Sequence, residues 1–244
     1  MVTTAALVIP LLALWLWWPC RMSRLARIAL VLVTTAAGIF PALLLKAVQT
    51  GAMAYTDIAP LQVPGGWVLA TLLMMAVLAL LRDAVWLMGK LLARPCWSLS
   101  AHSALPTVAA LAMSGALSGL GVYNALQPPQ IKEVNIVMPQ LPQALDGLRI
   151  AVLADIHASP VNNAVYVQTV VDRTLAAQPD LIVLPGDMVD GDVASGRQNI
   201  AALAQLHAPH GVWVAPGNHE YYSGYDSWMA EFRRLGLNVL ENRM

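Results

Sequence analysis

The chain has 244 residues, of which 58% are hydrophobic and only 11% are charged. Soluble proteins carry about 25% charged residues, so this composition excludes an ordinary soluble protein and indicates one that spans a membrane. The net charge is zero, but residues 1–127 are net +5 and residues 128–244 are net −5; neither part has a basic stripe, so we do not expect nucleic acid as a partner.

Four apolar runs predict a transmembrane region of four helices in residues 1–127. The first run begins at Ala5. The other three extend from Ile28 to Leu45, from Trp67 to Leu81 and from Ala104 to Leu126. The first run has about 17 residues, near the lower limit for a span. It lacks the basic start and the cleavage pattern of a signal peptide, so we expect it to be retained. Residues 47–66 are rich in proline and glycine, and we expect an exposed loop there.

The basic residues between these runs predict how the helices are oriented. The first loop carries Arg21, Arg24 and Arg27, the third carries Arg82, Lys90 and Arg94, and the second carries only Lys46. By the positive-inside rule the first and third loops are cytoplasmic. We therefore expect a multi-pass protein of the cell (inner) membrane, in contact with membrane lipids, whose C-terminal part lies on the outer or periplasmic face.

The composition changes to that of a folded α/β domain after the Pro128-Pro129 pair. Residues 128–147 indicate a linker with an initial strand, in which Val134, Ile136 and Met138 alternate with other side chains. We expect strands at 148–154, 180–184 and 212–215, and helices at about 163–177, 196–206 and 225–235, followed by a short apolar run at 237–240. This alternation predicts a layered α/β domain in residues 148–244, with largely parallel strands.

Three polar signatures follow these three strands. They are Asp155-Ile156-His157, Gly186-Asp187-Met188-Val189-Asp190 and Gly217-Asn218-His219-Glu220. In open α/β sheets, ligands bind beyond the carboxyl ends of the strands, so three such ends predict one shared site. Oxygen and nitrogen ligands without thiolate suit Mn, Fe, Zn or Mg rather than a sulfur-bound structural zinc.

The order D-x-H, G-D-x-x-D, G-N-H-E resembles that of the calcineurin-like metallophosphoesterases of the membrane-anchored bacterial type. The resemblance covers roughly residues 130–244. It implies a phosphodiesterase or phosphatase with two divalent metal ions (Mn, Fe, Zn or Mg) and hydroxide attack on phosphorus. It also implies the ligands: Asp155 and His157 for the first ion, Asp187 as the bridge and Asn218 for the second.

The same resemblance implies the catalytic residues. His219 corresponds to an imidazole that stabilises the transition state or protonates the leaving oxygen, and Asp190 would orient its ring. Asp192 and Glu220 are expected to be loop and capping residues rather than ligands. Tyr221 and Tyr222 either line a substrate cleft or pack beneath it.

The chain departs from the family pattern after His219, its last histidine. The family has a later histidine and a G-H-x-H motif, and it packs two sheets into a layered sandwich. We therefore expect the N-terminal half of such a domain, with weak metal binding and little hydrolase activity by itself. The alternative is a non-catalytic membrane-bound sensor or interaction protein. The expected substrate is a phosphoester, lipid-linked or derived from the cell envelope.

Overall fold

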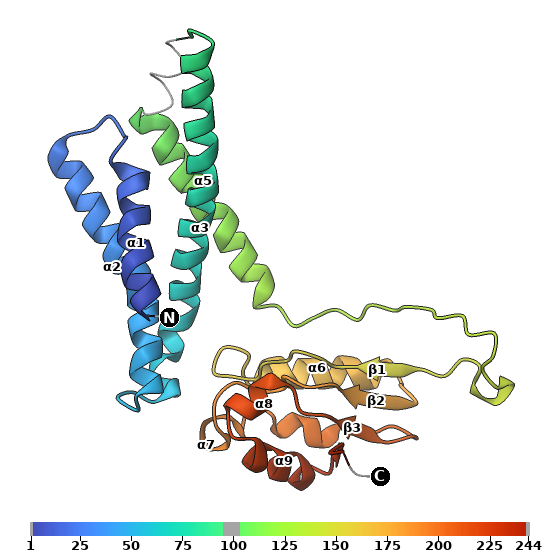
Figure 1. Cartoon of the computed structure of the whole chain (residues 1–244). Helices are drawn as coiled ribbons and strands as arrows, with labels where there is room; N and C mark the ends of the chain where they lie inside the picture. Colours follow the sequence, from blue (N-terminus) through green and yellow to red (C-terminus); the bar gives the residue numbers. More distant parts are fainter. Residues whose placement is uncertain (1, 95–102, 243–244) are drawn as a thin grey trace. The chain divides into compact units, whose positions relative to one another are not determined.

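The structure, a computed structural model, describes residues 2–94 and 103–242. The chain divides into two compact units, Met1–Ala125 and Leu126–Met244. We refer to them as the helical unit and the α/β unit, and Figure 1 shows their elements.

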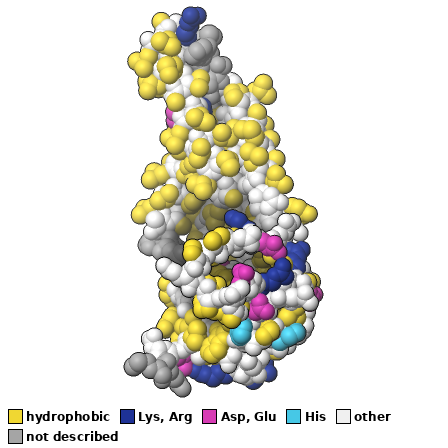
Figure 2. All heavy atoms as spheres, turned by 90° about the vertical axis from the view of Figure 1, so that its right-hand side faces the viewer, with side chains coloured by type: hydrophobic (Ala, Val, Ile, Leu, Met, Phe, Trp, Pro, Cys, Tyr) yellow, Lys and Arg dark blue, Asp and Glu magenta, His cyan; other side chains and the backbone are white. Residues whose placement is uncertain are grey.

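The helical unit consists of apolar helices. They are α1 (Val2–Trp17), α2 (Arg24–Gln49), α3 (Tyr55–Leu91) and α5 (Ala104–Ala125). Among the described residues, three helical stretches are long and apolar enough to cross a membrane, namely Arg24–Gln49, Thr56–Leu91 and Leu105–Ala125. Hydrophobic side chains cover most of the surface of this unit that is visible in Figure 2. The helical unit is therefore built for a lipid environment, as the composition predicts.

The first predicted span corresponds to α1, which is apolar and has 16 residues. At about 1.5 Å per residue its length is roughly 24 Å, less than the ~30 Å of a typical hydrocarbon core. A crossing by α1 therefore stays a prediction.

Residues 47–66 differ from the predicted loop, because α3 already begins at Tyr55. Asp57 accepts a hydrogen bond from the backbone nitrogen of Ala54 at 2.9 Å and so caps the start of the helix. Gly65 lets α3 approach α2, since a Cβ there would lie 3.2 Å from Pro41 Cγ. The proline- and glycine-rich sequence thus forms a helix that packs closely against its neighbour.

Charged groups of α3 are paired at the C-terminal end of α1. Arg82 donates hydrogen bonds to the carbonyls of Leu16 at 2.9 Å and Trp15 at 3.1 Å. Its Nε lies 2.8 Å from Asp83 Oδ1, and Asp83 also accepts from Trp15 Nε1 at 2.7 Å. Arg82 therefore satisfies helix-terminal carbonyls that have no partner within α1.

The α/β unit is built on one sheet of four parallel strands in the order β1-β2-β3-β4, of which Figure 1 labels the first three. The strands are β1 (Ile150–Val152), β2 (Leu181–Leu184), β3 (Val212–Val214) and β4 (Asn238–Val239). Between them lie α6 (Ala164–Ala176), α7 (Val193–Gly196), the 3₁₀ helix η2 (Ala201–Gln205), α8 (Asn218–Tyr222) and α9 (Tyr225–Arg234), and the 3₁₀ helix η1 (Gln143–Leu145) precedes β1. The predicted parallel α/β arrangement is confirmed.

The core of the α/β unit lies between the helices and one face of the sheet. Ile182 and Val214 point from β2 and β3 into this core and are fully buried. Val171 of α6 and Trp228 and Phe232 of α9 pack into the same cluster and are also fully buried. Burial of such large apolar side chains, each worth about 1.5–3 kcal/mol, is what fixes the helices on this face.

The opposite face of the sheet exposes apolar side chains. Ile150 and Val152 of β1 are 51% and 63% exposed, and Trp213 of β3 is 37% exposed. An open apolar sheet surface is what the sequence predicts for one half of a two-sheet sandwich. Among the described residues, the single sheet is covered on one face only.

Two predicted elements differ in the structure. The initial strand expected at Val134, Ile136 and Met138 is not formed; these side chains are exposed and the segment pairs with no strand of the described sheet. The helix expected at 196–206 is replaced by α7 and the 3₁₀ helix η2. Asp192 caps α7 through the backbone nitrogen of Ser195 at 2.9 Å, which starts the helix earlier than the apolar spacing indicates.

Candidate metal centre

The loops that follow β1 and β2 continue the parallel pairing of the two strands. The backbone nitrogen of His157 donates to the carbonyl of Asp187 at 3.0 Å, and that of Ala158 donates to Met188 at 2.8 Å. The nitrogen of Asp190 in turn donates to the carbonyl of Ala158 at 3.0 Å. These bonds hold the first and second polar signatures side by side.

The loops after β2 and β3 touch backbone to backbone, which only glycine permits. A Cβ on Gly217 would lie 2.2 Å from Asp187 Oδ1, and one on Gly186 would lie 2.5 Å from the nitrogen of Gly217. Gly186 also has a φ of +111°, which favours glycine. The second and third polar signatures are therefore locked against each other by two glycines.

A buried carboxylate also connects the same two loops by hydrogen bonds. Glu220, which is fully buried, accepts from the backbone nitrogens of Gly217 at 2.6 Å and Asp187 at 3.0 Å through Oε2. Its Oε1 accepts from the nitrogen of Met188 at 2.7 Å. The expected capping role of Glu220 is confirmed by its bond to Gly217. The two bonds to the other loop were not predicted, because they depend on how β2 and β3 pair.

Three side chains of the site leave the backbone at positions with positive φ. The φ angles are 54° for Asp155, 47° for His157 and 57° for Asp187. Residues other than glycine rarely adopt this region, and when they do they cluster at functional sites, where the surroundings impose the conformation. The hydrogen bonds of the paired loops supply that constraint.

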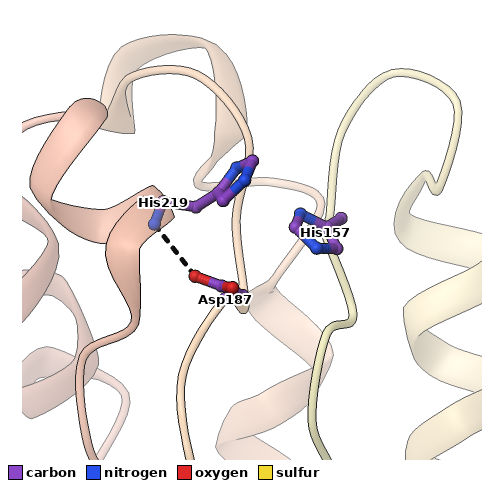
Figure 3. A group of neighbouring side chains, drawn as sticks. All are labelled: His157, Asp187 and His219. Carbon is purple, nitrogen blue, oxygen red and sulfur yellow. Dashed lines mark hydrogen bonds between the residues drawn. The ribbon is translucent and has the colours of Figure 1, made fainter.

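The three loops bring together two imidazoles and a carboxylate. Potential ligand atoms of His157, Asp187 and His219 all lie within 4.8 Å of one another. Figure 3 shows the three side chains converging from different segments, with the backbone nitrogen of His219 donating to Asp187 Oδ1 at 2.9 Å. The two rings meet edge to face, with centroids 4.4 Å apart. Imidazole nitrogens and a carboxylate at this spacing suit a divalent cation such as Mn, Fe or Zn.

Asp190 holds both histidine rings. Its Oδ1 lies 2.6 Å from His219 Nδ1 and 3.1 Å from His157 Nδ1. A carboxylate only accepts, so each Nδ1 carries the proton and each Nε2 keeps its lone pair for another partner. Metal-binding histidines are commonly oriented in this way. The contact of Asp190 with His219 agrees with the resemblance, whereas its contact with His157 was not predicted.

The two other predicted ligands lie at the margin of this group. Asp155 Oδ1 is 3.9 Å from His157 Nε2, and the Asp155 side chain is 72% exposed. Asn218 is exposed and opens α8 directly before His219. The structure thus gathers His157, Asp187 and His219 into one ligand group and leaves the carboxylate of Asp155 beside it.

Asp192, expected to be a loop or capping residue, has such a role, and two further histidines lie on the surface. Asp192 accepts from the Ser195 hydroxyl at 2.7 Å as well as from its backbone, and these bonds hold the pKa of Asp192 below its ordinary value. His207 is exposed and its Nδ1 lies 2.9 Å from the carbonyl of Gln205, and His210 is also on the surface.

Comparisons with known proteins point to one family. Residues 148–243 match the family model described as calcineurin-like phosphoesterase. A "transmembrane protein with metallophosphoesterase domain" from Danio rerio is 35% identical over 162 residues, which cover 64% of this chain and 36% of that protein. An "uncharacterized metallophosphoesterase" from Helicobacter pylori is 30% identical over 122 residues, or 50% of this chain and 32% of that protein. The chain spans about a third of the length of these relatives. No solved structure matches it.

Proposed function

We propose that this chain, whose residues 148–243 belong to the calcineurin-like phosphoesterase family, acts as a metal-dependent phosphoester hydrolase anchored in a membrane. The observation that carries the proposal is the shared carboxylate of Asp190, which holds His157 and His219 by their Nδ1 atoms. Both rings therefore keep Nε2 available for other partners. A histidine pair that served only packing would not need this arrangement.

The ligand set follows from the geometry and from the resemblance together. We assign His157 Nε2 and the carboxylates of Asp155 and Asp187 to a first divalent ion, and Asn218 to a second ion that Asp187 shares. The 3.9 Å between His157 Nε2 and Asp155 Oδ1 supports a common ion for these two groups. When bound, such ions neutralise the phosphoryl oxygens and lower the pKa of water.

The chain's own residues supply the proton. In the hydrolysis we propose, water forms the new bond to phosphorus while the bond from phosphorus to the leaving oxygen breaks. For this step His219 would be the imidazolium, with Nδ1–H held by Asp190 at 2.6 Å and a second proton on Nε2. It would give the Nε2 proton to the leaving oxygen, and the proton that the attacking water loses would pass to solvent. Its side chain is 35% exposed, which leaves the ring open to a substrate.

Metal binding by the purified chain tests the site directly. We expect Mn²⁺ to bind in a calorimetric titration and Asp187→Asn to weaken binding at least about tenfold, because a ligand charge is lost. The matched control is Asp172→Asn, an exposed carboxylate on α6, which should leave binding unchanged. Equal affinity of the wild type and Asp187→Asn would overturn the assignment.

Hydrolysis of bis(p-nitrophenyl) phosphate by membranes that carry the protein tests the reaction. In keeping with the little activity that the sequence predicts, we expect a low rate that requires added Mn²⁺ and is lost in His219→Gln. A rate that persists in this variant, or without metal, would contradict the proposal. As substrate class we propose phosphoesters at the membrane surface, including lipid-linked or envelope-derived ones.

The orientation that we propose places the α/β unit on the outer face of the cell membrane. Arg82 contacts the end of α1, and Arg21, Arg24 and Arg27 follow that end, so basic residues gather at one end of the helical unit. By the positive-inside rule this end is cytoplasmic. A C-terminal alkaline phosphatase fusion should be active, and a C-terminal green fluorescent protein fusion dark; the reverse pattern would contradict this orientation.

A further inference from the structure

An exposed tyrosine lies against the side of the candidate centre. The ring of Tyr222 has its centroid 5.8 Å from that of His219, and the residue is 78% exposed. The two residues are three apart on α8 (Asn218–Tyr222), so they share one side of the helix. Tyr222 therefore presents a large open aromatic surface next to the imidazole that we assign to the leaving oxygen.

The neighbouring tyrosine is arranged differently. Tyr221 stacks on Tyr225, with centroids 4.7 Å apart and ring planes at 14°. One face of the Tyr221 ring is thus already covered by another ring of the same chain. Tyr222 meets His219 at a tilt of 59°, which leaves its ring faces largely open.

We propose that Tyr222 determines substrate specificity by binding a planar ring on the leaving group of the phosphoester. The inference rests on the proposed function, because His219 defines where the leaving oxygen lies. A group attached to that oxygen extends past the His219 ring, and besides His157 the ring that lies against His219 is that of the exposed Tyr222. The substrate class is therefore an aryl phosphoester or a phosphoester with a planar heterocycle.

The chemistry of the ring favours a planar occupant over a saturated one. An exposed aromatic ring gains more from offset or edge-to-face contact with another π-system than from contact with an alkyl group of the same area. Tyr222 carries no charge, so it selects shape and planarity while the metal ligands bind the phosphoryl group.

Binding of non-hydrolysable phosphonates tests this role without relying on turnover. Benzylphosphonate carries a planar ring where the leaving group would be, and cyclohexylmethylphosphonate carries a non-planar ring of similar size. We expect the wild-type chain with Mn²⁺ to bind the benzyl compound about two- to tenfold more tightly, as a single aromatic contact provides. Tyr222→Ala should abolish this preference and Tyr222→Phe should keep it.

Tyr221→Ala is the matched control, because it removes an adjacent exposed tyrosine that stacks away on Tyr225. It should leave the preference intact. Equal affinity of the two phosphonates in the wild type, or a preference that survives in Tyr222→Ala, would overturn the role of Tyr222 and leave the proposed function standing. If neither phosphonate binds in a manner that depends on Mn²⁺ and Asp187, the proposed function fails and this inference fails with it.

Discussion

The buried carboxylate of Glu220 accepts a hydrogen bond from the backbone nitrogen of Asp187 at 3.0 Å, across 33 positions of the chain. Glu220 lies directly after His219, so one short segment carries both an imidazole of the centre and the clamp that fixes the opposite loop. The position of the Asp187 carboxylate therefore depends on a side chain that faces away from the solvent.

Replacing Glu220 with Gln should weaken this clamp. The amide has one acceptor oxygen where the carboxylate has two, so at least one of the three backbone donors loses its partner. We expect the free energy of unfolding to fall by about 1–3 kcal/mol, and Mn²⁺ binding to weaken. Urea unfolding and a metal titration measure the two effects. Glu133→Gln, an exposed position in the linker, is the control, and identical values in both variants would rule out the clamp.

Asp190→Asn should lower metal affinity although Asp190 is not an assigned ligand. Both Nδ1 atoms contact the same oxygen, Oδ1, and the neutral amide is a weaker acceptor than the charged carboxylate, so the rings of His157 and His219 are held less firmly. Loss of such an orienting partner typically costs about 10- to 100-fold in affinity. The control is Asp192→Asn, two positions on, whose carboxylate caps α7. Calorimetry that shows unchanged affinity in Asp190→Asn would contradict this role.

Gly217→Ala should disrupt the centre by contact alone. The φ of Gly217 is −100°, so alanine meets no backbone strain, but its Cβ would lie 2.2 Å from Asp187 Oδ1. We expect a loss of about 3 kcal/mol or more in unfolding free energy, together with loss of metal binding. Gly147→Ala separates steric contact from backbone strain. At Gly147 the φ is +80°, so alanine is strained, but no atom lies within 4 Å of the added Cβ. A smaller loss in Gly217→Ala than in Gly147→Ala would refute the close contact.

Stability of the α/β unit should depend on pH through Glu231. Hydrogen bonds from Arg234 at 2.7 and 2.9 Å hold the pKa of this buried carboxyl below its ordinary value of 4.5, and Arg197 adds a further contact at 3.2 Å. A lowered native pKa means that the unfolded chain binds more protons. The stabilisation is therefore complete above pH 4.5 and is lost as the pH falls through the native pKa.

The matching variant is Glu231→Gln. Its deficit in unfolding free energy, about 1–2 kcal/mol for a partly exposed pair, should be constant at neutral pH and shrink below pH 4.5. Urea unfolding of the wild type and the variant, at neutral pH and below pH 4.5, checks this. A deficit that grows on acidification would show that another group sets the pH dependence.

The strand ends and their polar residues could be predicted because the signals are local. The first three strands are short apolar runs, and Gly186 and Gly217 mark the turns that follow two of them. The double contact of Asp190 could not be predicted, because it depends on the pairing of Ala158 with Val189 beyond the strands. The order of residues along the chain does not show which residue of one loop lies opposite which residue of another.

The helical unit shows the same limit. Residues 47–66 contain the prolines and glycines of a loop, but α3 runs through them from Tyr55. In lipid the backbone must satisfy its own hydrogen bonds, so a helix tolerates Pro60 and Pro64 where a water-exposed segment would end. The apolar run from Trp67 predicted the helix itself, but its start at Tyr55, inside the predicted loop, was set by packing and solvent.

The left-handed backbone at Asp155, His157 and Asp187 decides how this centre is best engineered. Asparagine adopts such φ angles far more readily than alanine does, so a carboxamide swap removes a charge and keeps the loop's path. Alanine or valine at these positions would also change the backbone conformation. The effect of the lost charge could then not be separated from the effect of the moved loop. Mutant libraries aimed at a different ion preference should therefore draw these three codons from Asp, Asn, His and Gly.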